Sequence, residues 1–140
     1  MKQGSINTMF TDKELQLLNS ITEMFSIRAK HAKGKAFDEF MGQWYGFIIS
    51  VEKGYTLSIY DYTNDLSLRD LIDELEGQIP ESLRKKVISV VDPWDKRFEN
   101  ETNILQQPIH RKKDSPWWWY RIPKKLIGEL EEDIKSSGLI

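Results

Sequence analysis

The first hydrophobic stripe of the chain recurs at three- and four-residue intervals, the spacing that places side chains on one face of an α-helix. Thr11 and Glu14 precede it in the T-x-x-E pattern of a capping box, in which each side chain bonds the backbone N–H of the other residue. Gly34, flanked by two lysines, is typical of a helix end. The pattern therefore predicts a helix over residues 11–32.

A different pattern follows, in which β-branched and aromatic residues alternate on both sides of the short connection Glu52-Lys53-Gly54. Such alternation is typical of β-strands, and a glycine-containing connection of this length is typical of a hairpin. We therefore predict a β-hairpin over residues 43–62.

The aromatic run WWWY predicts a further strand over residues 116–122. Because successive side chains of a strand point to opposite faces, Trp117 and Trp119 share one face with Arg121. Both faces of this strand are apolar and need a cover, so we interpret the run as mainly structural. Exposure of Trp117 and Trp119 would instead indicate a binding site. Arg121 is expected to stack on aromatic rings or to pair with an acid such as Asp95.

Three further helices are expected over residues 67–77, 80–91 and 123–136. Ser67 and Asp70 match an S-x-x-D capping box at the start of the first of them. Pro80 and Pro123 suit the first turns of the other two. Asp92-Pro93 is expected to end the second, because proline does not fit the interior of a helix.

The order of these elements predicts an α+β fold with a small, mainly antiparallel sheet packed against helices. At 140 residues, of which 39% are hydrophobic and 30% charged, the chain is expected to form a single globular domain over residues 1–140. It has no cysteine, which excludes disulfides and a thiol nucleophile. The N-terminus lacks the apolar region of a signal peptide, and no apolar stretch is long enough to span a bilayer. We expect a soluble, cytoplasmic protein without membrane contact.

The formal net charge is only −2, but the charges are unevenly distributed. Residues 61–81 contain seven acids and a single base, Arg69. By contrast, residues 28–35 contain four bases, and residues 110–113 contain three, each segment with a histidine and no acid. Such a polarised charge distribution steers charged partners toward one part of a protein.

Common catalytic and nucleotide-binding motifs are missing from the sequence. Its two histidines, His31 and His110, lie in basic segments and are interpreted as solvated side chains. Asp92 and Asp95 are interpreted as residues favoured at a helix start, since their spacing suits that role. We therefore expect no enzymatic activity, catalytic residue, metal, cofactor or small-molecule substrate. A small hydrolase remains the third-ranked alternative.

The two basic segments, residues 28–35 and 110–113, favour a nucleic-acid-binding or regulatory module as the main alternative function. Phosphate binding requires several lysines and arginines on one surface, with exposed aromatic rings where single strands are stacked. However, the sequence contains no recognised nucleic-acid module, and its net charge is slightly negative. Nucleic acid is therefore not the partner in the leading interpretation.

The segments DPWDKRF, ENET and WWWYRIPKKLIGELEEDI, within residues 92–134, resemble patterns found in small immunity proteins of bacterial polymorphic-toxin and contact-dependent growth-inhibition systems. The resemblance implies a non-catalytic protein that binds the C-terminal domain of a cognate toxin in the bacterial cytoplasm. Because the toxin domains of such systems are commonly nucleases, it also implies a nuclease as the partner.

A nuclease holds its polyanionic substrate with basic residues, so an inhibitor that presents carboxylates fits the same cleft. The acid-rich segment agrees with this implication, and aromatic side chains are frequent hot spots of protein interfaces. The leading hypothesis is an immunity protein that binds its toxin through an acidic surface with aromatic anchors. The candidate partner-binding residues are Asp61, Asp65, Asp70, Asp73, Glu74, Glu76, Tyr60, Tyr62 and Trp44.

Overall fold

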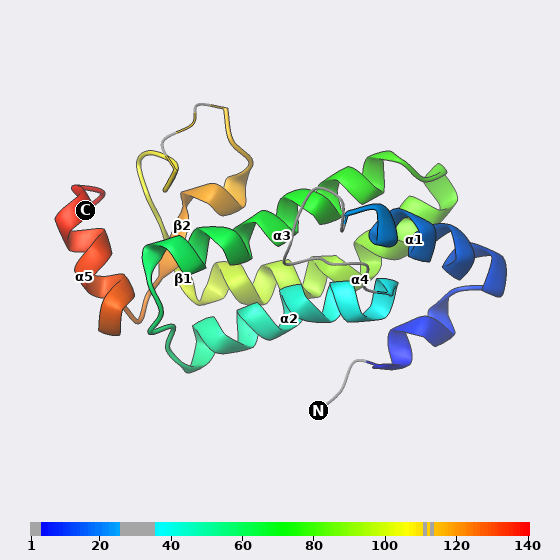
Figure 1. The fold of residues 1–140 in the computed structure, drawn as a ribbon, viewed down its shortest axis with the longest axis horizontal. Helices are drawn as coiled ribbons and strands as arrows, with labels where there is room; N and C mark the ends of the chain where they lie inside the picture. Colours follow the sequence, from blue (N-terminus) through cyan, green and yellow to red (C-terminus); the bar gives the residue numbers. More distant parts are fainter. Residues whose placement is uncertain (1–3, 26–35, 111, 113) are drawn as a thin grey trace.

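The computed structural model of the chain describes residues 4–25, 36–110, 112 and 114–140. In that part of the chain, five α-helices, two short strands and two 3₁₀ helices follow one another (Figure 1). The α-helices are α1 (Asp12–Phe25), α2 (Phe37–Lys53), α3 (Ile59–Gly77), α4 (Glu81–Asn100) and α5 (Gly128–Ser137). The strands are β1 (Thr102–Ile104) and β2 (Arg121–Pro123), and the 3₁₀ helices are η1 (Gly4–Met9) and η3 (Trp117–Tyr120).

The three long helices α2, α3 and α4 lie side by side and make up most of the length of the molecule (Figure 1). Near one end α1 packs against α2 and α3, and at the other end the two strands follow α4, with α5 beyond them against α3. The side chains of Trp44, Tyr62 and Phe98 lie between the long helices and have no exposed surface. Within the described ranges, none of the helices combines the length and the apolar character that a membrane-spanning segment requires.

The sheet consists of β1 and β2, which pair antiparallel with Thr102 opposite Pro123 and Ile104 opposite Arg121. The prediction of helices combined with a small antiparallel sheet is confirmed in this coarse form. Helices dominate the described chain far more than the predicted α+β fold implies, since the sheet has only three residues in each strand.

The hairpin predicted over residues 43–62 is wrong, because α2 covers its first half and α3 begins within its second half. The buried side chains of α2 follow helical spacing: Phe37, Phe40, Met41, Trp44, Phe47, Ile48 and Val51. A stripe this wide and this rich in aromatic residues also resembles a buried strand, and periodicity alone does not separate the two over a short window. The predicted hairpin turn is the end of α2, where Gly54 has a φ of 119°, a conformation that favours glycine.

The start of α3 lies well before the start predicted at Ser67. Ser58 and Asp61 form the capping box: the Asp61 N–H donates to the Ser58 hydroxyl (3.1 Å), and the Ser58 N–H donates to the Asp61 carboxylate (3.3 Å). Ser67 matches the same S-x-x-D pattern but lies inside the helix, where its hydroxyl donates to the Asn64 carbonyl. Of two equivalent sequence patterns, the earlier one begins the helix.

The first predicted helix is confirmed as α1, and its capping box forms as expected. The Thr11 N–H donates to the Glu14 carboxylate (2.8 Å), and the Glu14 N–H donates to the Thr11 hydroxyl (3.1 Å). The later part of the predicted span 11–32 lies outside the described residues. The helix predicted over 123–136 corresponds to α5, which begins later because Pro123 belongs to β2.

The helix predicted over residues 80–91 is confirmed as α4, but it continues through Asp92-Pro93. Pro93 has no N–H to donate to the preceding turn, and it lies on the exposed side of the helix. On the buried side, Asp95 and Phe98 continue the packed face of α4. Tertiary packing of this face therefore outweighs the hydrogen bond that Pro93 removes.

The strand predicted over residues 116–122 is confirmed only at its end, in β2. The tryptophans before it form η3, a tight helical turn rather than an extended segment. This turn allows the adjacent Trp118 and Trp119 both to be buried, whereas a strand would have placed them on opposite faces. Trp117 is half-buried. The mainly structural interpretation of the run thus agrees with the burial of Trp118 and Trp119, and Trp117 keeps accessible surface.

Candidate functional site

Two of the predicted partner-binding residues, Trp44 and Tyr62, are completely buried. The Trp44 indole N–H donates to the Asp95 carboxylate (3.1 Å), and the Tyr62 hydroxyl donates to the Arg121 carbonyl (2.9 Å). A side chain without exposed surface does not contact a partner of the folded protein. The prediction that these two rings are interface anchors is therefore wrong; both belong to the core.

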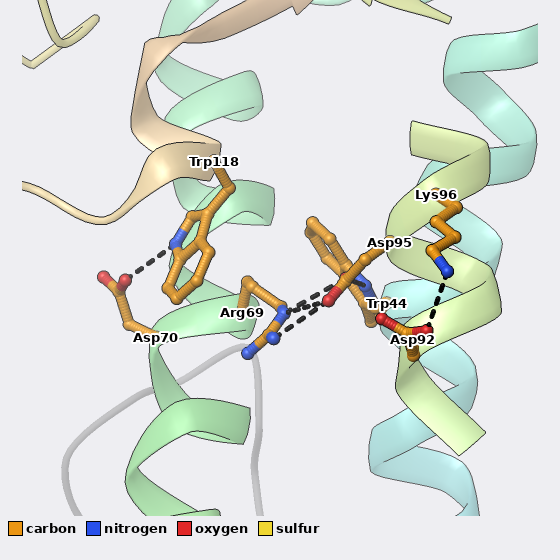
Figure 2. A network of polar contacts seen from close by, with 7 residues as sticks. All are labelled: Trp44, Arg69, Asp70, Asp92, Asp95, Lys96 and Trp118. Carbon is orange, nitrogen blue, oxygen red and sulfur yellow. Dashed lines mark hydrogen bonds and ion pairs between the residues drawn. The ribbon is translucent and has the colours of Figure 1, made fainter. Parts of the chain in front are cut away.

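Arg69, the only base of the acid-rich segment, points inward from α3 and pairs with Asp95 of α4 (Figure 2). Its Nε lies 3.1 and 3.2 Å from the two carboxylate oxygens, and its Nη2 lies 2.9 Å from Oδ2. Trp44 of α2 donates to the same carboxylate, so this centre joins all three long helices. Burial raises the pKa of Asp95, while the donors Arg69 and Trp44 act in the opposite direction.

Asp70, the next residue of α3, accepts hydrogen bonds from two indoles. Nε1 of Trp118 lies 2.9 Å from its carboxylate, and Nε1 of Trp119 lies 2.9 and 3.2 Å from the two carboxylate oxygens. The Arg69 guanidinium group lies over the Trp118 ring, 4.5 Å from its centroid. Asp70 therefore fastens η3 to α3. Asp70 is half-buried, and its role in partner binding stays a prediction, although its carboxylate already accepts these two indole donors.

A surface cavity of about 260 Å³ lies beside the Arg69–Asp95 pair, and we call it the Arg69 cavity. It is lined by Arg69, Glu76, Ile88, Val91, Asp92, Asp95 and Trp117. The third guanidinium nitrogen of Arg69, Nη1, is buried and has no hydrogen-bond partner in the structure. The exposed side chains of Ile88 and Asp92 show that the cavity opens to solvent.

The carboxylates of this cavity differ in their pairing. Asp92 pairs with Lys96 at 3.2 Å on the exposed side of α4 (Figure 2). The Glu76 carboxylate has no ion pair with any residue that the structure describes. Burial raises the pKa of Glu76, and the nearby Arg69 charge opposes that shift. A cation entering the cavity would therefore stabilise the ionised form of Glu76.

The remaining predicted acids of α3 do not gather at one site. Asp61 caps the helix, and Asp65 accepts a hydrogen bond from the Tyr55 hydroxyl (2.7 Å). Glu74 accepts one from the side chain of the exposed Gln78 (3.4 Å). Tyr60, the one predicted aromatic anchor that is accessible, is 73% exposed near the start of α3.

Asp73 is exposed and lines a surface hollow together with Asp70, His110 and Lys112. The His110 ring stacks on the Trp119 ring, with centroids 3.9 Å apart. Burial, followed by the Lys112 charge, lowers the pKa of His110, and Asp70 opposes this shift. The structure therefore brings two predicted acids next to one of the predicted basic segments.

This placement bears on the nucleic-acid alternative. Residues 28–35 lie outside the described residues, and of residues 110–113 only His110 and Lys112 are described. Because the carboxylates of Asp70 and Asp73 line the same hollow, a phosphate group placed there meets negative charge. The described part of this basic segment thus offers no purely basic surface.

The sequence did not predict the pairing of Arg69 with Asp95. For Arg121 it predicted either stacking on aromatic rings or pairing with an acid such as Asp95. Instead, Nη2 of Arg121 donates to the Glu99 carbonyl (3.3 Å). A signal was present, since Arg69 follows Tyr62 by seven residues and precedes Ile72 by three, which places it on their face of a helix. It was hidden because residue 62 was assigned to a strand and residue 69 to a separate helix.

Within the described ranges, no group of three or more His, Asp or Glu side chains is placed to hold a metal ion. Comparisons of the chain with protein-family models, with curated proteins and with solved structures found no match. The resemblance to immunity proteins and the expectation of a non-enzymatic role therefore stay predictions. What the site offers is a paired base inside the bundle, acids at the surface and one open cavity between them.

Proposed function

We propose that the chain is an immunity protein that neutralises a bacterial toxin domain, a nuclease of a polymorphic-toxin or contact-dependent inhibition system, by binding its basic surface. One observation carries the proposal: Arg69 is buried and neutralised by Asp95. All other charged side chains of α3 are acidic and more accessible than Arg69, which is only 7% exposed. Ordinary solvated helices mix both signs of charge on their outer face.

The accessible acids of α3 support this function through their electrostatics. A nuclease domain concentrates basic residues where it holds the phosphates of its substrate. Carboxylates that face those bases accelerate association and exclude partners of the same charge sign. Asp73 and Glu74, near the C-terminal end of α3, and the exposed Asp61, near its start, supply such charges, and the one base of α3 between them, Arg69, is buried.

The experiment that tests the function begins with a search beside this chain's gene for one that encodes a large secreted protein, and it uses the C-terminal domain of that protein. We expect the purified chain to bind that domain with an affinity tighter than micromolar, to abolish its nuclease activity at equimolar concentration, and to protect cells that express it. A neighbouring domain that is neither bound nor inhibited would overturn the proposal. An unrelated toxin domain of similar size and charge serves as the control, because a specific inhibitor does not protect against it.

A further inference from the structure

The Arg69 cavity contains a buried donor that the protein does not satisfy. Arg69 is only 7% exposed, and its Nη1 has no hydrogen-bond partner. Asp95 occupies the edge of the guanidinium group that carries Nε and Nη2 (Figure 2), which leaves Nη1 as the buried nitrogen without an acceptor. Because an unpaired buried donor is unfavourable, a molecule that brings an acceptor to Nη1 gains a strong hydrogen bond.

The other walls of the cavity favour a cation with an apolar stem. Glu76 supplies a carboxylate without an ion pair among the described residues, and Asp92 supplies one whose present partner, Lys96, is exposed and easily exchanged. The exposed Ile88 and the half-buried Trp117 supply apolar surface. Lysine and arginine side chains combine such a stem with a charged head.

We propose that the Arg69 cavity binds a lysine or arginine residue of the toxin domain. The cationic head of that residue pairs with Glu76 and Asp92, its aliphatic stem lies against Trp117, and its backbone carbonyl accepts a hydrogen bond from Nη1 of Arg69. This inference rests on the proposed function, since the partner is the same toxin domain. It locates one anchor of the interface in the seam between α3 and α4.

The balance of charges in the cavity argues against an anionic ligand. One guanidinium group faces three carboxylates, those of Glu76, Asp92 and Asp95, and Asp95 already neutralises the guanidinium group. A phosphate or a free carboxylate would have to approach the two remaining acids to reach Nη1. A basic residue within a peptide chain avoids this conflict because it carries both the cation and a neutral carbonyl acceptor.

The first test uses a small probe, Nα-acetyl-arginine N-methylamide, with the isotope-labelled protein. We expect a saturable shift of the Trp117 indole N–H signal, with a Kd in the millimolar range, about that of a single well-placed residue. The citrulline analogue has nearly the same shape without the charge, and it is expected to give no saturable shift. Equal binding of both probes, or no shift with the arginine probe, overturns the inference.

A matched pair of variants locates the binding. Glu76→Gln removes the charge inside the cavity and is expected to weaken probe binding about fivefold, a typical effect for one partly exposed ion pair. Glu81→Gln makes the same change at an exposed acid that does not line the cavity, and it is expected to leave probe binding unchanged. Equal effects of the two substitutions would contradict a site at Glu76. Unchanged thermal unfolding of both variants shows that neither result comes from a folding defect.

Titration of the toxin domain separates this inference from the proposed function. If the domain binds the wild-type chain and Glu76→Gln weakens that binding about tenfold, the result supports both the proposed function and the cavity as its anchor. If the domain binds equally to wild type and Glu76→Gln, the cavity is not its anchor, and the proposed function survives. If the arginine probe binds but the domain does not, the proposed function fails, and the cavity remains a site for basic residues of another protein.

Discussion

Two consecutive residues of α3 build polar centres of opposite kinds. Arg69 meets the charge of Asp95 inside the helical bundle, whereas Asp70 meets only the neutral indole donors of Trp118 and Trp119. Neighbouring residues of a helix point about 100° apart, so the first reaches α4 and the second reaches η3. The Arg69 centre is therefore electrically neutral and joins the three long helices. The Asp70 centre keeps a negative charge close to the surface and attaches the segment that follows β1.

This difference predicts two kinds of failure. Loss of one partner at the Arg69 centre leaves an unpaired charge buried in the bundle, which lowers the free energy of unfolding of the whole domain. Loss of the acceptor at the Asp70 centre leaves two indole donors unpaired, and the damage is greatest where η3 contacts α3. The substitutions below break one centre at a time.

Asp95→Ala is expected to have the largest effect, a decrease in the free energy of unfolding of about 3–5 kcal/mol, because it leaves the Arg69 charge unpaired. Urea unfolding at neutral pH measures it. The double substitution Arg69→Met with Asp95→Leu removes both charges and is expected to recover most of the loss. A decrease below about 1 kcal/mol for Asp95→Ala, the usual limit of an exposed ion pair, would show that the centre is not a buried one.

Asp70→Ala is expected to lower the free energy of unfolding by about 2 kcal/mol, because the indoles of Trp118 and Trp119 lose their acceptor. Hydrogen exchange of these two indole N–H groups should accelerate more than exchange of the Trp44 indole, which bonds Asp95. Asp70→Asn keeps one acceptor oxygen and should fall between the wild type and Asp70→Ala. Uniform acceleration at all three indoles would contradict the separation of the two centres.

Ser58→Ala removes the side-chain cap of α3 and is expected to lower the free energy of unfolding by about 1 kcal/mol. Ser67→Ala is the matched control, since Ser67 lies within the helix and its loss should change stability by less than about 0.5 kcal/mol. Thermal unfolding distinguishes the two variants. A larger effect at Ser67 would indicate that Ser67, and not Ser58, caps α3. That result would contradict the helix start on which the positions of both polar centres depend.

The smallest effect concerns pH and His110, which stacks on Trp119 at the Asp70 centre. Burial lowers the pKa of His110, so the unfolded chain binds a proton more readily than the folded chain. The stability that neutral His110 contributes is complete above its ordinary pKa of about 6.5 and decreases as the pH falls toward the lowered value. Unfolding curves at several pH values should show this decrease in the wild type, and His110→Asn should reduce it. An unchanged pH profile in His110→Asn would contradict the assignment.

The sequence predicted well those features that depend on local chemistry. The Thr11–Glu14 capping box begins α1 as expected, and the periodic stripes of α4 and α5 identify both helices. The end of α4 was misplaced because Pro93 is unfavourable within a helix only when packing does not compensate. Tertiary contacts on the buried face, absent from any local pattern, decided this position.

The site was harder to predict because its parts come from distant segments. The sequence shows the acids of α3 as one group, yet in the helix they point in different directions: Glu76 lines the Arg69 cavity, and Asp70 accepts hydrogen bonds from η3. Misassignment of residues 43–62 to a hairpin also made Trp44 and Tyr62 look available to a partner. Burial depends on the whole fold, and it places both aromatic residues in the core, where a partner does not reach them.

The central proposal is that α3 presents acids to a basic toxin domain, since its only base, Arg69, is buried and paired with Asp95. Its most direct test is the association rate of that domain with the double variant Asp73→Lys, Glu74→Lys at low and high salt. The matched control is Glu129→Lys, Glu132→Lys, which reverses two exposed acids of α5. We predict a decrease of about tenfold or more at low salt for the α3 variant, a smaller decrease at high salt, and little change for the control. Equal association rates of the α3 variant and the wild type at low salt would contradict the account.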